Sequence, residues 1–307
     1  MRTLLECAFF LSDNLLLLFI CMNLTSFLES QEVTRPHYVL FGNPVEHSLS
    51  PLMHNLALEY YDMEERYHAV ELQSNELSIL ASYLNKDTLK GANITIPYKQ
   101  KIAEYLDEID SAARAVGAVN TIVKKDYRLK GYNTDVSGFL APLEDYLDDI
   151  MGGRSIIFGT GGASRALVTA LSRVGMEEIY LVSRKPARIN SFNSFENVQI
   201  ISYPEWNAYG EDAILIVNAT PLGMAPRVES SPVGAGEQQY LQDSICYDIV
   251  YNPLKTTFLK QAETAGAETI GGLEMLIEQG SRSFEYWTGN SFPLDIIRER
   301  LYGKLEE

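Results

Sequence analysis

The chain has 307 residues, 46% of them hydrophobic, which is enough to form one large core or two cores of about 150 residues each. Its 41 acidic and 25 basic residues give a net charge of -16, which disfavours a nucleic-acid backbone or an anionic membrane surface as a partner. We therefore predict two domains and no nucleic-acid or membrane partner, so local groups must hold any small anionic ligand.

The N-terminal segment is apolar but matches no targeting signal well. The run Asn14–Leu28 is uncharged, but it is shorter than the roughly 20 residues that span a bilayer. A secretory signal would begin with positive charge and end at a small-residue cleavage site, and only Arg2 supplies early charge. We expect residues 1–36 to form an extension outside the fold, with a membrane anchor as the less favoured alternative.

Cysteines and histidines give no sign of a metal site. Neither residue type shows the spacing of a zinc site or a redox pair, so we expect no metal and a reducing, cytoplasmic location. The residues concerned are Cys7, Cys21, Cys246, His37, His47, His54 and His68.

From His37 onward, short β-branched runs alternate with helical patterns of about 12 residues, which indicates βαβ units and a mostly parallel sheet. Two series of strands are expected, with a hinge near Asp135–Asp149. The first series is expected at 38–41, 67–71, 91–96 and 119–124, and the second at 155–158, 179–182, 198–201, 214–218 and 245–249.

Polar residues stand at several strand ends of the first half. Strand periodicity places Asn93 and Thr95 on one face, and Pro97 then ends the strand just before Lys99. Asn120 and Asp135 follow at later strand ends. Because ligands of open α/β sheets bind at the carboxyl ends of strands, these groups can converge on one cleft.

A further polar group precedes the first helix of this half. Ser50 before Pro51 is a good N-cap, and Ser48 stands two residues earlier. Together with the helix N-terminus, the two hydroxyls can form a neutral seat for a carboxylate.

A glycine-rich turn opens the second series. Gly159, Gly161 and Gly162, followed by Ala163, lie between a strand and an apolar helix, as the dinucleotide fingerprint requires. Ser164 replaces the third glycine of the usual pattern, so an ordinary strand-to-helix turn stays open as the alternative.

The end of the next strand discriminates between NAD and NADP. An NAD site carries an acidic residue there to bind the ribose 2'-hydroxyl, whereas this chain has Ser183, Arg184, Lys185 and Arg188. Guanidinium groups bind phosphate oxygens in a bidentate manner, so the pattern favours NADP over NAD.

Several motifs follow one another in a fixed order along the chain. They are the serine pair, Asn93–Lys99, Ala118–Thr121, Tyr132–Asp135, the glycine loop, Asn218–Met224, Asp248–Pro253 and Gly272–Leu276 with Gln279. With this set of motifs, the chain resembles the shikimate dehydrogenase family from Tyr38 to the C-terminus. Ser183 stands where many members have Asn, and residues 1–36 have no counterpart.

The resemblance implies an α/β fold with an N-terminal substrate-binding domain (37–135), a Rossmann-like doubly wound NADP-binding domain (136–270) and C-terminal helices returning to the first domain (271–307). It implies an NADP-dependent oxidoreductase that reversibly reduces 3-dehydroshikimate to shikimate in chorismate biosynthesis. The oligomeric state is expected to be monomer or homodimer.

Residue roles follow from the same resemblance. Lys99 is implied as the proton donor and acceptor, and Asp135 as the residue that orients it. The implied substrate-binding residues are Ser48, Ser50, Asn93, Thr95, Asn120, Tyr251 and Gln279. The implied cofactor-binding residues are Gly159, Gly161, Gly162, Ala163, Ser183, Arg184, Lys185, Arg188, Thr220, Gly272 and Met275.

Two other functions stay open. A quinate/shikimate dehydrogenase that uses NAD shares the Lys-Asp pair, but the basic run at 184–188 disfavours it. A non-catalytic dinucleotide-binding regulator would have no need of both Lys99 and Asp135.

Overall fold

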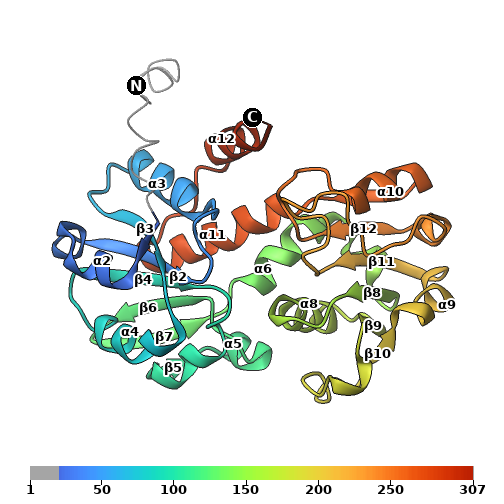
Figure 1. Cartoon of the computed structure of the whole chain (residues 1–307), viewed down its shortest axis with the longest axis horizontal. Coiled ribbons are helices and arrows are strands. Elements are labelled where there is room, and N and C mark those ends of the chain that lie inside the picture. Colours follow the sequence, from blue (N-terminus) through green and yellow to red (C-terminus); the bar gives the residue numbers. More distant parts are fainter. Residues whose placement is uncertain (1–20, 307) are drawn as a thin grey trace. The chain divides into compact units, whose positions relative to one another are not determined.

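The computed structural model describes residues 21–306 and divides into two compact units (Figure 1). The first unit contains residues up to 109 together with 119–132 and 286–288, and the second contains 110–118, 133–285 and 289–307. Each unit holds one β-sheet, so the predicted α/β class with two domains is confirmed.

The first unit is built on a seven-stranded mixed sheet in the order β1-β3-β2-β4-β6-β7-β5. Strands β1 to β4 are parallel, whereas β6 pairs antiparallel with both β4 and β7. The strands are β1 (Met22–Asn23), β2 (His37–Gly42), β3 (Arg66–Glu71), β4 (Leu89–Ile94), β5 (Glu108–Ile109), β6 (Thr121–Lys125) and β7 (Arg128–Tyr132).

Short helices connect these strands. They are α2 (Leu24–Glu29), η2 (Gln31–Thr34), α3 (Ser50–Tyr60), η3 (Ser74–Glu76), α4 (Leu77–Tyr83) and η4 (Lys101–Tyr105). The central strand β2 is buried along its whole length, because parallel strands with helices on their faces bury both sides.

Residues 22–34 belong to this fold, so the expectation that residues 1–36 lie outside it is wrong for this part. Strand β1 pairs in parallel with β3, and Asn23 caps α2 by accepting from the Ser26 backbone N–H at 2.8 Å. Leu24 and Phe27 are 1% and 0% exposed. Apolar residues that we expected in an extension outside the fold thus form the buried side of the short helix α2. Residues 1–20 lie outside the described part.

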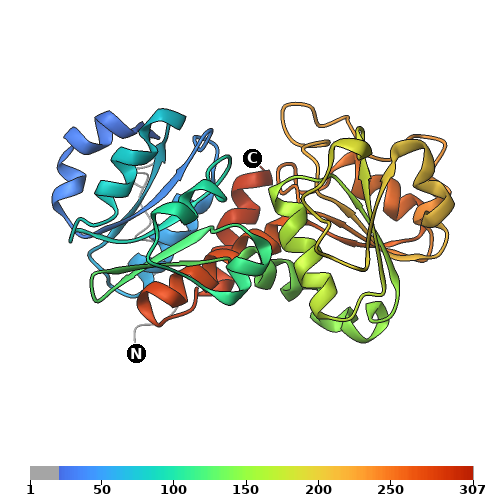
Figure 2. The same ribbon diagram turned by 90° about the horizontal axis from the view of Figure 1, so that it is seen from below.

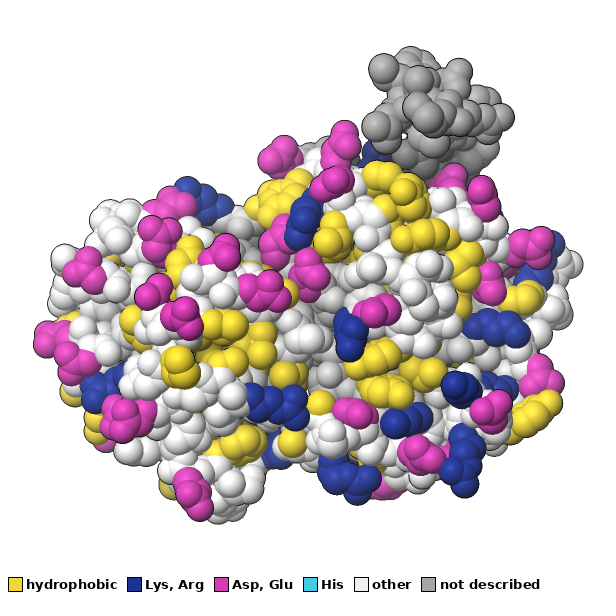
Figure 3. Space-filling view, turned by 180° about the vertical axis from the view of Figure 1, so that it is seen from behind, with side chains coloured by type: hydrophobic (Ala, Val, Ile, Leu, Met, Phe, Trp, Pro, Cys, Tyr) yellow, Lys and Arg dark blue, Asp and Glu magenta, His cyan; other side chains and the backbone are white. Residues whose placement is uncertain are grey.

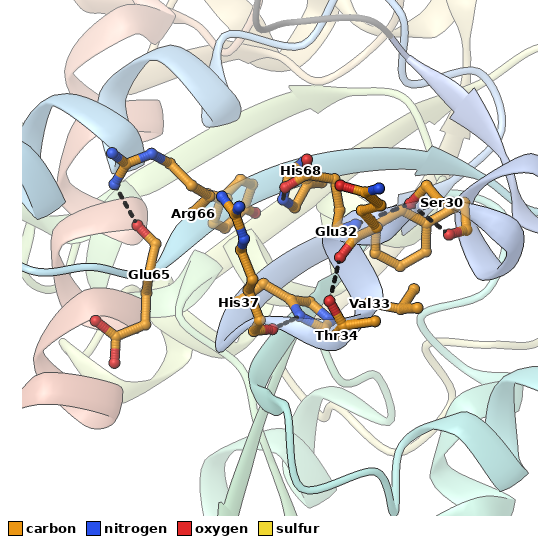
Figure 4. Close-up of polar contacts among 12 residues, drawn as sticks. Ser30, Glu32, Val33, Thr34, His37, Glu65, Arg66 and His68 are labelled. Carbon is orange, nitrogen blue, oxygen red and sulfur yellow. Dashed lines mark hydrogen bonds and ion pairs between the residues drawn. The ribbon is translucent and has the colours of Figure 1, made fainter.

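Phe27 packs among polar aromatic groups. Its ring contacts His37, His68 and Tyr83 at centroid distances of 5.6, 5.6 and 5.9 Å. Figure 4 shows Glu32, on η2, near His68, and their closest atoms are 3.5 Å apart. Burial lowers the pKa of His68 to about 4, so the ring is neutral at neutral pH.

The second unit is built on a six-stranded parallel sheet in the order β10-β9-β8-β11-β12-β13. The strands are β8 (Arg154–Phe158), β9 (Glu178–Ser183), β10 (Val198–Ser202), β11 (Ala213–Asn218), β12 (Ile245–Asp248) and β13 (Glu268–Ile270). The order reverses direction between β8 and β11, which is the switch point where doubly wound sheets bind ligands.

Helices cover both faces of this sheet. Ile157, Leu181 and Val217 pack with α8 (Gly162–Arg173) on one face, whereas Ile156 and Phe158 pack on the other face with α10 (Thr257–Ala265) (Figure 2). The remaining helices are α5 (Ser111–Val116), α6 (Asp135–Leu140), η5 (Ala141–Tyr146), α7 (Leu147–Ile150), η6 (Pro186–Arg188), η7 (Tyr203–Glu205), α9 (Asn207–Gly210), η8 (Gln238–Leu241), α11 (Gly272–Thr288) and α12 (Leu294–Glu306).

The nine expected strands are present, with ends within two residues of the expected positions. Strand β4 ends at Ile94, so the expected alternation holds for Asn93 but not for Thr95, which lies beyond the strand. The division also differs from the expected boundaries, because α5 belongs to the second unit and the chain enters that unit again at Asn133.

Three residues of α11, Tyr286–Thr288, belong to the first unit, and the rest of the helix belongs to the second. The Trp287 ring stacks on Tyr38 at a centroid distance of 4.8 Å, and its Nε1 donates to the backbone oxygen of Ile122 at 2.9 Å. Its ring also fills the space above Gly91, where any side chain would collide with it.

Candidate active site

Asn93 and Asn120 lie side by side at the centre of the first sheet. Asn93 is near the end of β4, and Asn120 directly precedes β6. The Asn93 side-chain Nδ2 donates to the Asn120 backbone oxygen at 3.0 Å and to Thr121 Oγ1 at 3.1 Å. The sheet pairing therefore brings together two of the expected substrate-binding amides.

The segment after β4 carries Thr95 and Lys99. The Thr95 N–H donates to the Phe41 carbonyl at 2.9 Å, and the Lys99 carbonyl accepts from the Val119 N–H at 2.7 Å. Between them, the hydroxyl of buried Tyr98 donates to the backbone oxygen of Leu72. Fixed backbone on both sides thus holds the half-buried Lys99 just beyond the strand end.

Ser48 and Ser50 lie at the start of α3, but the predicted cap is wrong. Leu49 is the N-cap residue, and Ser50 makes no capping bond with its side chain. Instead, the Ser48 hydroxyl accepts from the Ser50 N–H at 3.2 Å. Ser50 still begins an 11-residue helix and the Ser48 hydroxyl lies against its first N–H, so both are near the helix N-terminus, where unpaired N–H groups favour an anion.

Asp135 and Gln279 belong to the second unit. Asp135 is the first residue of α6 and is 8% exposed, and its N–H donates to Asn133 Oδ1 at 3.0 Å. The Thr134 hydroxyl donates to Gln279 Oε1 at 3.4 Å. Gly138 faces α11 so closely that a Cβ would lie 2.7 Å from the Gln279 Cβ. The packing of α6 against α11 thus places Gln279 beside the start of α6, where Asp135 lies.

The glycine loop between β8 and α8 is open above its backbone. Gly159 has a positive φ of 109°, and a Cβ there would lie 2.8 Å from the Ala219 oxygen, so the position requires glycine. A Cβ at Gly161 or Gly162 would meet nothing within 4 Å. Ser164 is fully buried, and its hydroxyl donates to the Gly159 carbonyl at 3.0 Å. This serine closes the loop where the usual fingerprint has glycine, so the loop remains suited to a pyrophosphate.

The basic run follows β9 directly. Ser183 is buried and accepts from the Lys185 N–H at 3.2 Å, which turns the chain at the strand end. Arg184, Lys185 and Arg188 are all exposed. Ala163 lies in the first turn of α8, so the described residues supply both a helix N-terminus and three exposed cations to the expected nucleotide site.

A buried polar network, whose hydrogen bonds the sequence did not predict, holds the loop that follows β11. Asn218 Nδ2 donates to Asp248 Oδ1 at 3.0 Å and to the Leu222 carbonyl at 3.0 Å, while Asn218 Oδ1 accepts from the Thr220 hydroxyl at 2.7 Å. The Thr256 hydroxyl donates to Asp248 Oδ2 at 2.6 Å. Burial raises the pKa of Asp248 to about 6, and these hydrogen bonds oppose that rise.

The other expected site residues lie at the same end of the second sheet. Tyr251 follows β12, and burial raises the pKa of its hydroxyl. Gly272 begins α11 where a side chain would collide with the Ile249 carbonyl. Met275 is 9% exposed and packs in the core of the unit, so it offers a ligand only a small area.

No group of three His, Cys, Asp or Glu residues among those described could hold a metal ion. One cavity of roughly 60 Å³ lies in the first unit. Its lining contains none of the expected substrate or cofactor residues and consists of Glu32, Arg35, Pro36, His37, Glu64, Arg66 and His68.

Comparisons with known proteins identify the family. The shikimate dehydrogenase substrate-binding domain model matches residues 40–122, and the shikimate 5'-dehydrogenase C-terminal domain model matches residues 272–302. A shikimate dehydrogenase (NADP(+)) from Moorella thermoacetica is 40% identical over 266 residues, which are 84% of this chain and 90% of that protein. The chain belongs to the shikimate dehydrogenase family.

Solved structures agree with this assignment. A shikimate 5-dehydrogenase from Thermus thermophilus, in complex with NADP(H) and shikimate, is 32% identical with a TM-score of 0.76, covering 86% of this chain and 97% of that one. A quinate dehydrogenase from Corynebacterium glutamicum in complex with NAD is 28% identical with a TM-score of 0.79, covering 88% and 99%. With this coverage, both alignments extend over the two units, so the likeness holds for the fold of each.

Acidic and basic side chains are interspersed on the face drawn in Figure 3. Among residues 21–306, no helix has the length and apolar character to cross a membrane.

Proposed function

We propose that this protein catalyses the reversible NADPH-dependent reduction of 3-dehydroshikimate to shikimate, a step of chorismate biosynthesis. The observation that supports this most is family membership across both units, combined with the presence of Lys99, Asp135 and the buried Asn93–Asn120 pair. The enzyme is thus an NADP-dependent oxidoreductase that acts on a CH–OH group.

The residues of the second unit fit a dinucleotide. Open space above Gly161 and Gly162 and the N-terminus of α8 suit a pyrophosphate, and Gly159 allows close backbone approach. Thr220 donates to Asn218, which in turn donates to Asp248, and Thr220 would lie along the nicotinamide. When bound, NADPH supplies a hydride to the carbonyl carbon of the substrate.

Lys99 is the proposed proton donor for the oxygen of the reduced carbonyl. As the carbonyl becomes an alkoxide, a positioned ammonium stabilises the charge and transfers a proton to oxygen, and in the reverse direction the amine accepts it. We assign to Asp135 the orientation of Lys99 and the acceptance of hydrogen bonds from the ring hydroxyls.

The remaining polar groups bind the substrate. Ser48 and Ser50, at the start of α3, are proposed to bind the carboxylate. Amides and hydroxyls recognise the ring hydroxyls, and such a site rejects analogues that lack a hydroxyl because its buried polar groups would be left unpaired. The residues proposed for this role are Asn93, Thr95, Asn120, Tyr251 and Gln279.

Choice of NADP over NAD is assigned to the exposed run after β9. Arg184, Lys185 and Arg188 offer charge-assisted hydrogen bonds to a 2'-phosphate, and the chain has no carboxylate between Ser183 and Arg188 to bind a 2'-hydroxyl.

One assay separates this function from its alternatives. Purified protein is mixed with shikimate or quinate and with NADP or NAD, and absorbance of the reduced nicotinamide is followed. We expect turnover with shikimate and NADP to be fastest. Faster turnover with quinate and NAD would support the other family member, and no turnover with binding of NADP would support a regulator. The cytoplasmic location and the monomeric or homodimeric state remain predictions.

A further inference from the structure

A chain of four buried side chains runs through the candidate substrate site. The Tyr67 hydroxyl donates to Asn93 Oδ1 at 2.7 Å, Asn93 Nδ2 donates to Thr121 Oγ1 at 3.1 Å, and the Thr121 hydroxyl donates to Asn120 Oδ1 at 2.9 Å. Tyr67, Thr121, Asn120 and Asn93 are 1%, 0%, 3% and 7% exposed. Two members, Tyr67 and Thr121, were not among the expected site residues.

A backbone carbonyl fixes the direction of this chain. The Asn120 carbonyl lies 3.0 Å from the side chain of Asn93, and because a carbonyl can only accept, the atom of Asn93 that faces it must be the amide nitrogen. Asn93 therefore turns its oxygen to the other side, where the Tyr67 hydroxyl must donate. Burial raises the pKa of Tyr67 well above its ordinary value, so the hydroxyl keeps its proton.

The second amide takes its orientation from Thr121. Thr121 Oγ1 accepts from Asn93, and its own hydrogen needs an acceptor because the residue is fully buried. That acceptor is Asn120 Oδ1, so the Asn120 amino group is directed to the opposite side of its side chain. Both N–H bonds of Asn93 point to protein acceptors. The oxygen is thus the remaining polar atom of Asn93 that can serve a ligand, and it accepts, whereas the Asn120 amino group lies on the side of its amide away from Thr121.

Packing holds the first member of the chain. The His54 ring stacks face to face on Tyr67, with centroids 4.2 Å apart and an interplanar angle of 2°. The Tyr67 backbone is also bound on both sides by the Asn55 side chain, at 2.8 and 2.9 Å. These contacts hold Tyr67 in one position, so that its hydroxyl can donate to Asn93 with a fixed direction.

We propose that Tyr67 and Thr121 are positioning residues that set which amide accepts and which donates, and thereby determine which pattern of ring hydroxyls the enzyme takes. This proposal rests on the proposed function, because it assigns Asn93 and Asn120 to the ring hydroxyls of shikimate. Neither Tyr67 nor Thr121 contacts the reacting atoms in this scheme.

The decisive variants are Thr121→Val and Thr121→Ser. Valine removes both the acceptor for Asn93 and the donor to Asn120, whereas serine keeps both. Loss of one neutral hydrogen bond is worth about 1 kcal/mol, so Thr121→Val should raise the KM for shikimate by about five- to tenfold. Turnover should stay within about threefold, because the proton donor is unchanged. Thr121→Ser should match the wild type in both constants.

A matched control tests whether loss of any buried threonine hydroxyl would raise the KM for shikimate. Thr169 is 3% exposed in α8, and its hydroxyl donates only within the helix, to the Arg165 carbonyl at 2.8 Å. Thr169→Val should leave the KM for shikimate unchanged. The KM for NADP should be unchanged in all three variants.

Specificity supplies a readout that a purely structural role would not move. The ratio of kcat/KM for shikimate to kcat/KM for an analogue that lacks one ring hydroxyl should fall at least threefold in Thr121→Val, because a rotated amide no longer distinguishes the two. General loosening of the fold would lower both values and leave the ratio unchanged.

Tyr67→Phe tests the other end of this series of hydrogen bonds. It also replaces Thr121→Val as the test if that variant does not fold. Removing the donor to Asn93 Oδ1 should raise the KM for shikimate about threefold to fivefold. Tyr83→Phe is its control, since Tyr83 is also buried and bonded, to His37 Nε2 at 2.6 Å, but lies outside the chain.

The outcomes separate this proposal from the proposed function. A wild type inactive on shikimate overturns the function, and side-chain amide exchange measured by NMR then still tests the positioning: Asn93 Nδ2 hydrogens should exchange about tenfold faster in Thr121→Val than in Thr169→Val. If the wild type is active, two results overturn the positioning role alone. In the first, Thr121→Val and Thr169→Val have the same KM, specificity ratio and amide exchange. In the second, Thr121→Ser behaves like Thr121→Val.

Discussion

The two units offer different kinds of groups to their proposed ligands: the first offers buried neutral side chains, and the second offers exposed cations and backbone. In the first, Asn93 and Asn120 are 7% and 3% exposed and are fixed by neighbouring side chains. In the second, Arg184, Lys185 and Arg188 are exposed, and the glycine loop offers backbone and empty space. In the proposed sites, groups that are oriented before the ligand binds would recognise neutral hydroxyls, whereas hydrated cations would bind a phosphate.

This difference has a physical reason. A buried neutral amide is costly when unpaired, so a wrong ligand is rejected strongly. Burying an unpaired guanidinium in the free enzyme would cost far more, so cations that await a phosphate stay in solvent. The first site should therefore respond to packing changes, and the second to salt.

Removing the buried Phe27 is the largest disturbance we expect, and it tests the dependence on packing. Phe27→Ala leaves a cavity among His37, His68 and Tyr83 and should lower the free energy of unfolding of the first unit by about 3 kcal/mol or more. Chemical denaturation would measure this, with Tyr127→Ala as control because Tyr127 is 84% exposed. Equal stability of the two variants would show that residues 22–34 do not contribute to the fold.

Lys99→Ala should come next and tests the proposed proton transfer. Loss of the proton donor should lower turnover by a factor of about 100 or more and leave NADP affinity nearly unchanged. Exposed Lys101 lies two residues away, so Lys101→Ala is the matched control and should keep full activity. If turnover of Lys99→Ala were within a few-fold of the wild type, Lys99 would not be the proton donor.

Arg184→Ala sharpens the comparison on the cofactor side. Removing one charge-assisted hydrogen bond to the 2'-phosphate should raise the KM for NADP about tenfold and leave that for NAD unchanged. The effect should shrink at high salt, whereas that of Thr121→Val should not. Arg173→Ala removes an exposed arginine at the end of α8 and is the control. Equal weakening with both cofactors would contradict a role in binding the 2'-phosphate.

The smallest effect concerns Asp248, the buried carboxylate of the second unit. Its pKa is about 6 in the fold and 3.8 by itself, so its contribution to stability is full below pH 3.8 and is lost as pH rises through 6. Asp248→Asn cannot ionise, its Oδ1 can still accept from Asn218, and its amide nitrogen can donate to Thr256 Oγ1, which reverses the direction of that hydrogen bond. The melting temperature of this variant relative to the wild type should therefore rise by a few degrees between pH 4 and 7. Exposed Asp243→Asn should show no such trend.

The sequence predicted the strands well where apolar residues are continuous, as in β2, β8 and β11, because buried parallel strands have few polar interruptions. It missed β7, whose second buried position is Gly131 and therefore carries no apolar side chain, and β13, which has only three residues. The strands β1 and β5 were missed because two residues carry no periodicity.

Site residues at strand ends were predictable from motif and topology, but their partners were not. The sequence places Asp248 at the end of a buried strand, which indicates a possible site, yet its bonds to Asn218 and Thr256 join residues 30 and 8 positions apart. Tyr67 and Asn93 likewise meet only because β3 and β4 both flank β2. Contacts of this kind depend on register, which no local pattern encodes.

Trp287 has a consequence for how the protein is made. A ribosome releases the N-terminal half first, and domains usually fold in that order. Here the first unit needs a residue that is synthesised after residues 133–285 of the second unit, because Trp287 packs on Tyr38 and bonds Ile122. Its ring centroid is also 6.2 Å from that of Tyr67, which begins the directed amide chain. The unit that starts synthesis can thus be completed only after most of the second unit has been made, and the packing around Tyr38 and Tyr67 waits for this one residue.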